Sequence, residues 1–116
     1  MGLSGTGNGD TFLRMSAART TAARSRFSFD SLSDATTWMA GPDGELQQSA
    51  GDRWDRVHEG VGGIIGIEIV GTNVEVVQDY NGGGMFRAWV EDDGSHKCLV
   101  FREDSWESGP ENWNGR

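Results

Sequence analysis

The chain has 116 residues, 18 of them glycine, and its 10 basic and 18 acidic side chains give a formal net charge of −8. This length fits one domain, and an acidic chain repels phosphate groups, so nucleic acid and anionic membrane surfaces are excluded as main partners. Because the sequence contains no apolar run of about 18 residues, no signal-peptide pattern and only one cysteine, we expect a cytoplasmic protein that does not span a membrane.

The N-terminal stretch alternates glycine with polar residues from Gly5 to Asp10, directly before a predicted helix. Backbone N–H groups in such a stretch can face a ligand without obstruction by Cβ atoms, which favours a carboxylate, a phosphate or a developing oxyanion. The same composition is typical of a flexible N-terminal leader. The spacing matches neither the Walker loop nor the dinucleotide-binding pattern. The residues alone leave both interpretations open.

Two helices are expected next. Asp10 or Thr11 can cap a helix over residues 11–27, whose alanines form a stripe of small side chains. A second helix is predicted over residues 31–39, with Ser31 or Asp30 as its cap. A Gly-Pro-Asp-Gly breaker separates it from one more helical turn at 45–50. Four arginines of the first helix are expected to be solvated or paired with acids: Arg14, Arg19, Arg24 and Arg26.

The second half of the chain changes to a β-type pattern. Residues 61–70 are almost continuously apolar and β-branched, which is typical of a central strand buried on both faces. Three shorter strands are expected at 74–80, 85–91 and 97–101, with an Asp-Gly hairpin turn between the last two. We therefore predict one α+β domain over residues 1–102, in which two helices are followed by a four-stranded antiparallel meander.

The expected sheet presents apolar side chains to both faces, whereas the helices can cover only one of them. This predicts either an oligomer or a place within a larger fold. Residues 103–116 form an acidic tail without periodicity, which we expect to be disordered. His58 stands alone before the central strand and is expected to be solvated, and Cys98 is expected to be a small core residue. Two histidines and one cysteine do not suggest a metal site, and we expect no cofactor.

Four blocks of the sequence occur in a defined order along residues 3–102. They are Ser-Gly-Thr-Gly-Asn-Gly-Asp-x-Phe-Leu-Arg before an alanine-rich helix, Gly-Glu-Leu-Gln, the segment Gly60–Ile67, and Asn-Gly-Gly-Gly-Met-Phe-Arg-Ala at 81–88. In this order they resemble the plant-type asparaginase and isoaspartyl peptidase family, most closely its fungal members. The resemblance implies an N-terminal-nucleophile hydrolase with an αββα sandwich, in which a second sheet supplies the missing cover.

The resemblance also implies an activity and site residues. In the family, the precursor cuts itself, and the threonine that begins the β chain provides the hydroxyl nucleophile and, through its α-amine, the base. At the matching positions, Thr6 through its hydroxyl and Gly7 through its N–H would form the oxyanion hole. Gly9 would offer its carbonyl to the α-ammonium group of the substrate. The expected reaction is hydrolysis of the side-chain amide of asparagine or of an isoaspartyl peptide bond.

The sequence also departs from the family pattern. It contains no Thr-Val-Gly-type nucleophile segment, it lacks the arginine and aspartate that hold the substrate, and Gly5 stands where many relatives carry cysteine. We therefore expect the C-terminal part of a β chain, a fragment or truncated form that is inactive alone and needs the missing upstream chain or another copy. The alternative is a non-catalytic interaction or anion-binding module that dimerises through its uncovered sheet, and a third possibility is a remnant without function. The residues do not define a preference among asparagine, isoaspartyl peptides and glycosylasparagine.

Overall fold

The computed structural model describes residues 1–54 and 56–102 and divides the chain into two compact units, with the boundary between Gly82 and Gly83. Helices and antiparallel strands are both present, so the expected α+β class is confirmed. The four-stranded meander is not confirmed, because the described strands form one sheet of three strands and another of two. The tail that we expected to be disordered, 103–116, lies outside the described residues.

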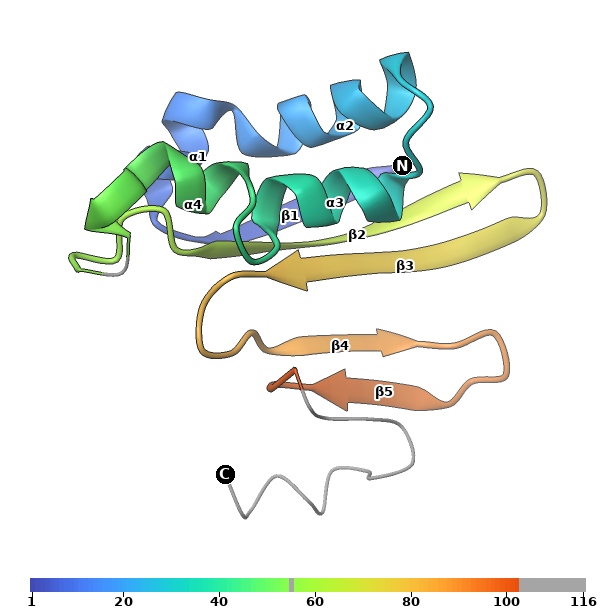
Figure 1. Cartoon of the computed structure of the whole chain (residues 1–116). Helices are drawn as coiled ribbons and strands as arrows, with labels where there is room; N and C mark the ends of the chain where they lie inside the picture. Colours follow the sequence, from blue (N-terminus) through green and yellow to red (C-terminus); the bar gives the residue numbers. More distant parts are fainter. Residues whose placement is uncertain (55, 103–116) are drawn as a thin grey trace. The chain divides into compact units, whose positions relative to one another are not determined.

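A three-stranded antiparallel sheet underlies the helices of the first unit (Figure 1). Its strands are β1 (Gly2–Gly7), β2 (Gly62–Val70) and β3 (Asn73–Tyr80), in the order β1-β2-β3. The two strands that the sequence predicts in this region are confirmed. Gly71 makes the turn between them at a φ of +62°, a conformation that suits glycine. β2 is the central strand, as its continuous apolar run predicts.

The glycine-rich N-terminal stretch is a strand and not a flexible leader. β1 pairs with β2 over its whole length, from Gly2 opposite Ile67 to Gly7 opposite Gly62. Glycine weakens a strand, so the residues of β1 do not favour this conformation by themselves. The long apolar β2 supplies the hydrogen-bonding partner that stabilises it. The leader interpretation is therefore wrong for this segment, and a strand precedes the helices.

Four helices cover one face of this sheet, as Figure 1 shows. They are α1 (Gly9–Met15), α2 (Ala17–Phe27), α3 (Leu32–Ala40) and α4 (Glu45–Ala50), and a 3₁₀ turn follows at Gly51–Arg53. Ser31 caps α3 as predicted, because its side chain accepts a hydrogen bond from the Asp34 N–H at 3.0 Å. Within the described part of the chain, no helix has both the length and the apolar character needed to cross a membrane.

The helix predicted over residues 11–27 is divided at Ser16. This residue has a left-handed φ of +45°, and its N–H donates to the Leu13 carbonyl at 3.1 Å, which ends α1. The Ser16 carbonyl then accepts a hydrogen bond from the Thr20 N–H at 2.8 Å, which starts α2. The break carries neither glycine nor proline, so the usual signals of a helix end are absent from the sequence.

Close packing between α1 and the sheet depends on two glycines. A Cβ atom at Gly5 would lie 2.3 Å from Cε1 of Phe12, and one at Gly62 would lie 2.5 Å from Cε2 of the same ring. The ring of Phe12 therefore rests directly on the backbone of β1 and β2. Leu46 from α4 reaches the same place, 3.2 Å from the Gly62 position, and belongs to the buried core together with Ile64.

The register divides the side chains of the sheet between two faces. Successive residues of a strand point to opposite faces, so Ile64, fully buried in the core, lies under the helices and Ile65 lies on the other face. On that other face Ile67 is 46% exposed, Ile69 64% and Val74 52%. We call this surface the open face, defined by Ile65, Ile67, Ile69, Val74 and Val76. The helices thus cover one face of the sheet and leave aliphatic side chains on the other.

The described part of the second unit contains a β-hairpin of β4 (Arg87–Val90) and β5 (His96–Leu99). The predicted Asp-Gly turn is confirmed, since the Glu91 N–H donates to the Ser95 carbonyl at 2.9 Å and Gly94 has a φ of +84°. Both strands have 4 residues and are shorter than the sequence predicts.

Cys98 lies on an exposed face of this hairpin. It pairs with Ala88, and both residues are exposed. The predicted alternation along the strand is correct, but the side that carries Cys98 is not covered. The prediction that Cys98 is a core residue is therefore wrong.

Gly62→Ala is expected to destabilise the first unit by about 1–3 kcal/mol, because overpacking displaces the ring of Phe12 from the sheet. Gly2→Ala is the matched control, since a Cβ at Gly2 would meet no atom within 4 Å. Denaturant unfolding measures the difference as a shift in midpoint at constant slope. Equal stability of the two variants would show that the ring does not rest on Gly62.

Candidate functional site

The peptide bond between Thr6 and Gly7 lies at the end of β1, just before the turn into α1. The Asn8 N–H donates to the Val61 carbonyl at 2.9 Å, which extends the β1–β2 ladder by one step. Backbone groups of an antiparallel strand alternate between the partner strand and the opposite side. The N–H groups of Thr6 and Asn8 therefore point to β2, and that of Gly7 points away from it. Because β1 ends the sheet, the Gly7 N–H points to an edge that no other described strand pairs with.

The side chain of Thr6 lies on the side of the sheet opposite the helices. Its partner across the ladder is Gly63, which has no side chain, and Thr6 is exposed. Within residues 1–54 and 56–102, its hydroxyl makes no hydrogen bond. The Thr6 hydroxyl and the Gly7 N–H are thus two available donors at the corner where the open face meets the edge of β1.

Position 7 requires glycine. Gly7 has a φ of +136°, and a Cβ there would lie 2.3 Å from the Val61 carbonyl oxygen and 2.5 Å from Cα of Gly62. Any other residue would strain the backbone and collide with β2. This close approach fixes the position of Gly7 and, with it, the direction of its N–H.

Gly9, the third residue that the family resemblance implies, is the exposed first residue of α1. In the α-helical hydrogen-bond pattern, the Gly9 carbonyl accepts a hydrogen bond from the Leu13 N–H. A carbonyl oxygen has a second lone pair, which can accept from another donor. A Cβ at Gly9 would meet no atom within 4 Å, so packing does not require glycine there. The structure brings Thr6 and Gly7 together and places Gly9 beyond the turn.

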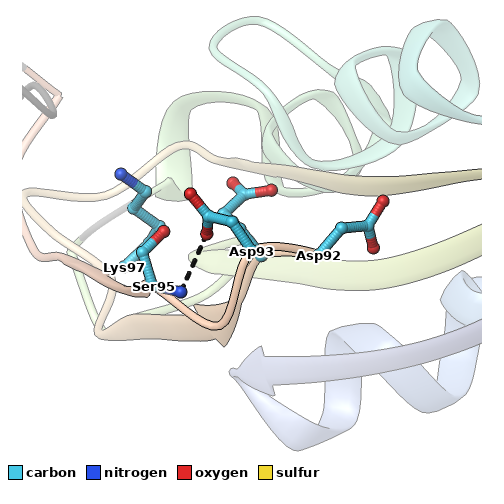
Figure 2. A pocket seen from close by; sticks show the side chains of 5 residues that line it. Asp92, Asp93, Ser95 and Lys97 are labelled. Atoms are coloured by element: carbon cyan, nitrogen blue, oxygen red, sulfur yellow. Dashed lines mark hydrogen bonds between the residues drawn. The ribbon is translucent and has the colours of Figure 1, made fainter.

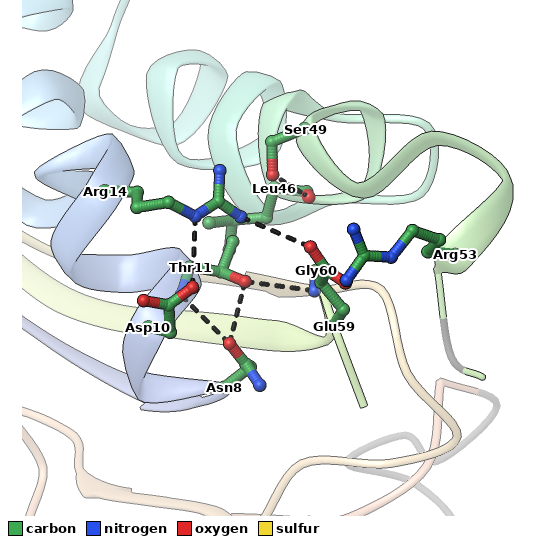
Figure 3. Close-up of polar contacts among 9 residues, drawn as sticks. All are labelled: Asn8, Asp10, Thr11, Arg14, Leu46, Ser49, Arg53, Glu59 and Gly60. Carbon is green, nitrogen blue, oxygen red and sulfur yellow. Dashed lines mark hydrogen bonds and ion pairs between the residues drawn. The ribbon is translucent and has the colours of Figure 1, made fainter. Parts of the chain in front are cut away.

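A buried threonine holds the turn between β1 and α1 (Figure 3). Asn8 Oδ1 accepts hydrogen bonds from the Thr11 N–H at 2.9 Å and from the Thr11 hydroxyl at 2.8 Å. The Thr11 hydroxyl in turn accepts a hydrogen bond from the Gly60 N–H at 3.1 Å. Asn8 is therefore the N-cap of α1, and the prediction of Asp10 or Thr11 as the cap is wrong. Thr11 instead links the start of α1 to the segment before β2.

Asn81 fixes the same segment from the other side. Its Oδ1 accepts a hydrogen bond from the Gly62 N–H at 3.1 Å, and its Nδ2 donates to the Gly60 carbonyl at 2.8 Å. The Asn81 N–H donates to the Gly62 carbonyl at 3.1 Å. Two side chains far apart in the sequence thus fix the backbone on which Gly7 rests. Sequence reasoning missed these roles of Thr11 and Asn81, and it missed the cap Asn8 although asparagine is a preferred N-cap residue.

Charged side chains surround this turn. Arg14 pairs with Asp10 at 3.1 Å and with Glu59 at 3.7 Å, and Arg53 pairs with Glu59 at 2.7 Å. Figure 3 shows Glu59 between the two arginines, next to Gly60. The prediction of acid-paired arginines is confirmed for Arg14, and the pairs help to hold the segment before β2.

Two other residues that the sequence singled out take no part in this corner. Arg24 has a structural role, and His58 is exposed to solvent. Arg24 pairs with Asp30 and lies over the ring of Trp38, 4.2 Å from its centroid, which joins α2 to α3. His58 is exposed in the loop before β2, as expected.

An acidic depression of about 410 Å³ lies on the hairpin of the second unit (Figure 2). It is lined by Glu91, Asp92, Asp93, Ser95 and Lys97. The Ser95 N–H donates to Asp93 Oδ1 at 2.8 Å, and hydrogen bonds from Ser95 lower the pKa of Asp93 below its usual value. Such a bond stabilises a turn. Among the described residues, no three His, Cys, Asp or Glu side chains lie so that they could hold a metal ion. The hydrogen bond between Ser95 and Asp93 assigns this cluster a role in the turn.

Neither the comparison with protein-family models nor the comparison with curated proteins found a match to this chain. The resemblance of the four sequence blocks therefore stays a prediction. The corner at Thr6 and Gly7 offers two hydrogen-bond donors. Such a pair can stabilise a negatively charged oxygen, but it cannot itself remove a proton.

Thr11→Val is expected to lower the stability of the first unit by about 1–3 kcal/mol, because it leaves the buried Gly60 N–H without an acceptor. Thr11→Ser keeps the hydroxyl and is expected to retain most of that stability. Thr37→Val is the control, since Thr37 is exposed on α3. Thermal or denaturant unfolding of the three variants tests the assignment. A loss for Thr37→Val as large as that for Thr11→Val would contradict it.

Proposed function

We propose that this chain is the oxyanion-hole part of an asparaginase-type amidohydrolase of the N-terminal-nucleophile class. Its substrate would be the side-chain amide of asparagine or an isoaspartyl peptide bond. The observation that carries the proposal is the corner at Thr6 and Gly7. A backbone N–H that β2 does not use lies there next to a hydroxyl that makes no hydrogen bond within residues 1–54 and 56–102.

The two donors act where charge develops. Attack of a nucleophile on the amide carbonyl places negative charge on the carbonyl oxygen, and hydrogen bonds that strengthen at that stage lower the barrier. The rigid support of Gly7 favours this role, because a donor already in position needs no reorganisation during the reaction. Under this proposal the nucleophile and its base come from a part of the enzyme outside these 116 residues. Collapse of the tetrahedral intermediate breaks the C–N bond and expels ammonia, or the amine of an isoaspartyl peptide, which leaves an acyl-enzyme. Water then hydrolyses the acyl-enzyme and releases aspartate.

The directions of the two donors define the side from which the substrate and the nucleophile would reach this corner. The Gly7 N–H points outward from the free edge of β1, and the Thr6 side chain lies on the side of the open face. The reacting carbonyl and the nucleophile must therefore reach this corner from beyond β1. A second sheet packed on the open face, about 10 Å away, would complete the αββα arrangement that the family resemblance implies.

The alternative proposal is a non-catalytic module that binds an anion at the same corner and associates through the open face. The exposed aliphatic side chains of that face favour it. The two proposals differ in what the donors bind, because a binding module holds a stable anion and an enzyme stabilises a transient one. Kinetics of a completed enzyme therefore distinguish them.

The purified chain is expected to release no ammonia from asparagine or β-aspartyl dipeptides, because an oxyanion hole without a nucleophile leaves little catalysis. Ammonia detection with wild-type chain and the Thr6→Val variant measures this. Turnover by the wild-type chain that disappears in Thr6→Val would show that the chain contains its own nucleophile. That result would contradict the proposal of an incomplete enzyme.

A chimera tests the oxyanion assignment directly, with residues 3–102 replacing the matching part of an active family member. In an active chimera, Thr6→Val is expected to lower kcat by about 100- to 1000-fold with a smaller effect on KM, because the lost hydroxyl acts in the transition state. Thr6→Ser restores the hydroxyl and is expected to recover activity. Ser4→Ala is the control, since Ser4 is exposed on the same side of β1. Full activity of Thr6→Val would refute the assignment.

A further inference from the structure

α1 has fewer buried residues than the other α-helices of the first unit. Thr11 is its only buried residue, whereas α2, α3 and α4 each bury two or more. The main contacts that hold α1 are the ring of Phe12 on the glycine backbone of β1 and β2 and the hydrogen bond from the Gly60 N–H to the Thr11 hydroxyl. An element with so few buried contacts opens locally at a low cost in free energy.

The bend between α1 and α2 is unfavourable by itself. Ser16 has a left-handed φ of +45°, which costs free energy for any residue other than glycine. No side chain caps α2, so the N–H groups of its first three residues have no acceptor within that helix. One local hydrogen bond, from the Thr20 hydroxyl to the Met15 carbonyl at 2.8 Å, bridges the bend. The bend therefore depends largely on the contacts of α1 with the rest of the unit.

The same segment of sequence is able to form one continuous helix. Residues 9–27 contain no proline, and glycine occurs only at their first position, whereas alanine and arginine, which favour helices, are frequent. With Ser16 in the right-handed helical conformation, the N–H groups of Ala18 and Arg19 would find acceptors in the carbonyls four residues earlier. The local preference of the chain thus opposes the bend that docking on the sheet imposes, and such a conflict can give an element two states.

We propose that Ser16 is a hinge and that α1 has two states. In the docked state α1 packs on the sheet as described above. In the extended state α1 leaves the sheet and continues α2 as one helix. Ala17 is 2% exposed and Thr21 is fully buried, so α2 stays in place and α1 is the part that moves.

This movement opens the corner at Thr6 and Gly7. Asn8 caps α1 and moves with it, so its N–H leaves the Val61 carbonyl, which it contacts at 2.9 Å in the docked state. The last step of the β1–β2 ladder is then lost, and the Gly7 N–H no longer has a fixed direction. A ligand that needs this donor binds the docked state and shifts the population toward it. The inference does not rest on the proposed enzyme function, because the two states follow from the bend alone.

Two substitutions at the hinge shift the two states in opposite directions. Glycine accepts the left-handed conformation and weakens a continuous helix, whereas alanine does the reverse. In the full chain, we expect amide hydrogen exchange at Asn8 and Gly60 to be about 30-fold faster in Ser16→Ala than in Ser16→Gly, with wild type between them. Ser25→Ala and Ser25→Gly are the matched controls inside α2, which is helical in both states, and are expected to leave these two rates equal. Equal exchange at Asn8 and Gly60 in the two Ser16 variants would overturn the proposal.

A second comparison separates joining of the two helices from melting of α1. Phe12→Ala removes the ring that docks α1, and it is combined with each of the two substitutions at position 16. With Ser16→Ala, we expect α1 to join α2, which retains the helical circular dichroism signal and slows exchange at Ala18 and Arg19. With Ser16→Gly, the continuous helix is weakened, so a smaller helical signal and fast exchange at Ala18 and Arg19 are expected. Equal helical signal and equal exchange in the two double variants would overturn the proposal, because α1 would then not depend on residue 16.

Discussion

The ring of Phe12 rests on the backbone at Gly5 and Gly62, and this contact sets how closely the helices approach the sheet. A side chain at either glycine would occupy the position of the ring, so α1 would have to move away from β1 and β2. With α1 in place, the turn at Asn8 is short, and Thr11 can reach the Gly60 N–H. The arrangement of the N-terminal corner thus depends on two residues that lack a side chain.

The same constraint determines what the candidate site can offer. β1 ends where Gly7 approaches the Val61 carbonyl too closely for any side chain, and its peptide alternation turns the Gly7 N–H outward. Thr11 and Asn81 fix the opposing backbone through hydrogen bonds to Gly60 and Gly62. The donor therefore belongs to a rigid strand end, which suits stabilisation of a transient charge better than a mobile loop would.

Local signals predicted those parts of the fold that local interactions determine. The Ser31 cap, the apolar β2 and the Asp-Gly turn each depend on residues close in sequence, and each is confirmed. β1 was missed because its partner β2, and not its own composition, makes it a strand. The family resemblance pointed to Thr6, Gly7 and Gly9 but gave no geometry. The supporting roles of Thr11 and Asn81 depend on contacts across 49 and 21 residues, which no local pattern reveals.

Amide hydrogen exchange along β1 tests the central claim most directly, because it reports each N–H separately. If β1 is an edge strand paired with β2, the N–H groups of Ser4, Thr6 and Asn8 exchange slowly, since they donate to β2. Those of Leu3, Gly5 and Gly7 exchange fast, since they point to the free edge. Fast exchange at all six positions would identify a flexible leader, and slow exchange at Gly7 would show that its N–H is not available to a substrate.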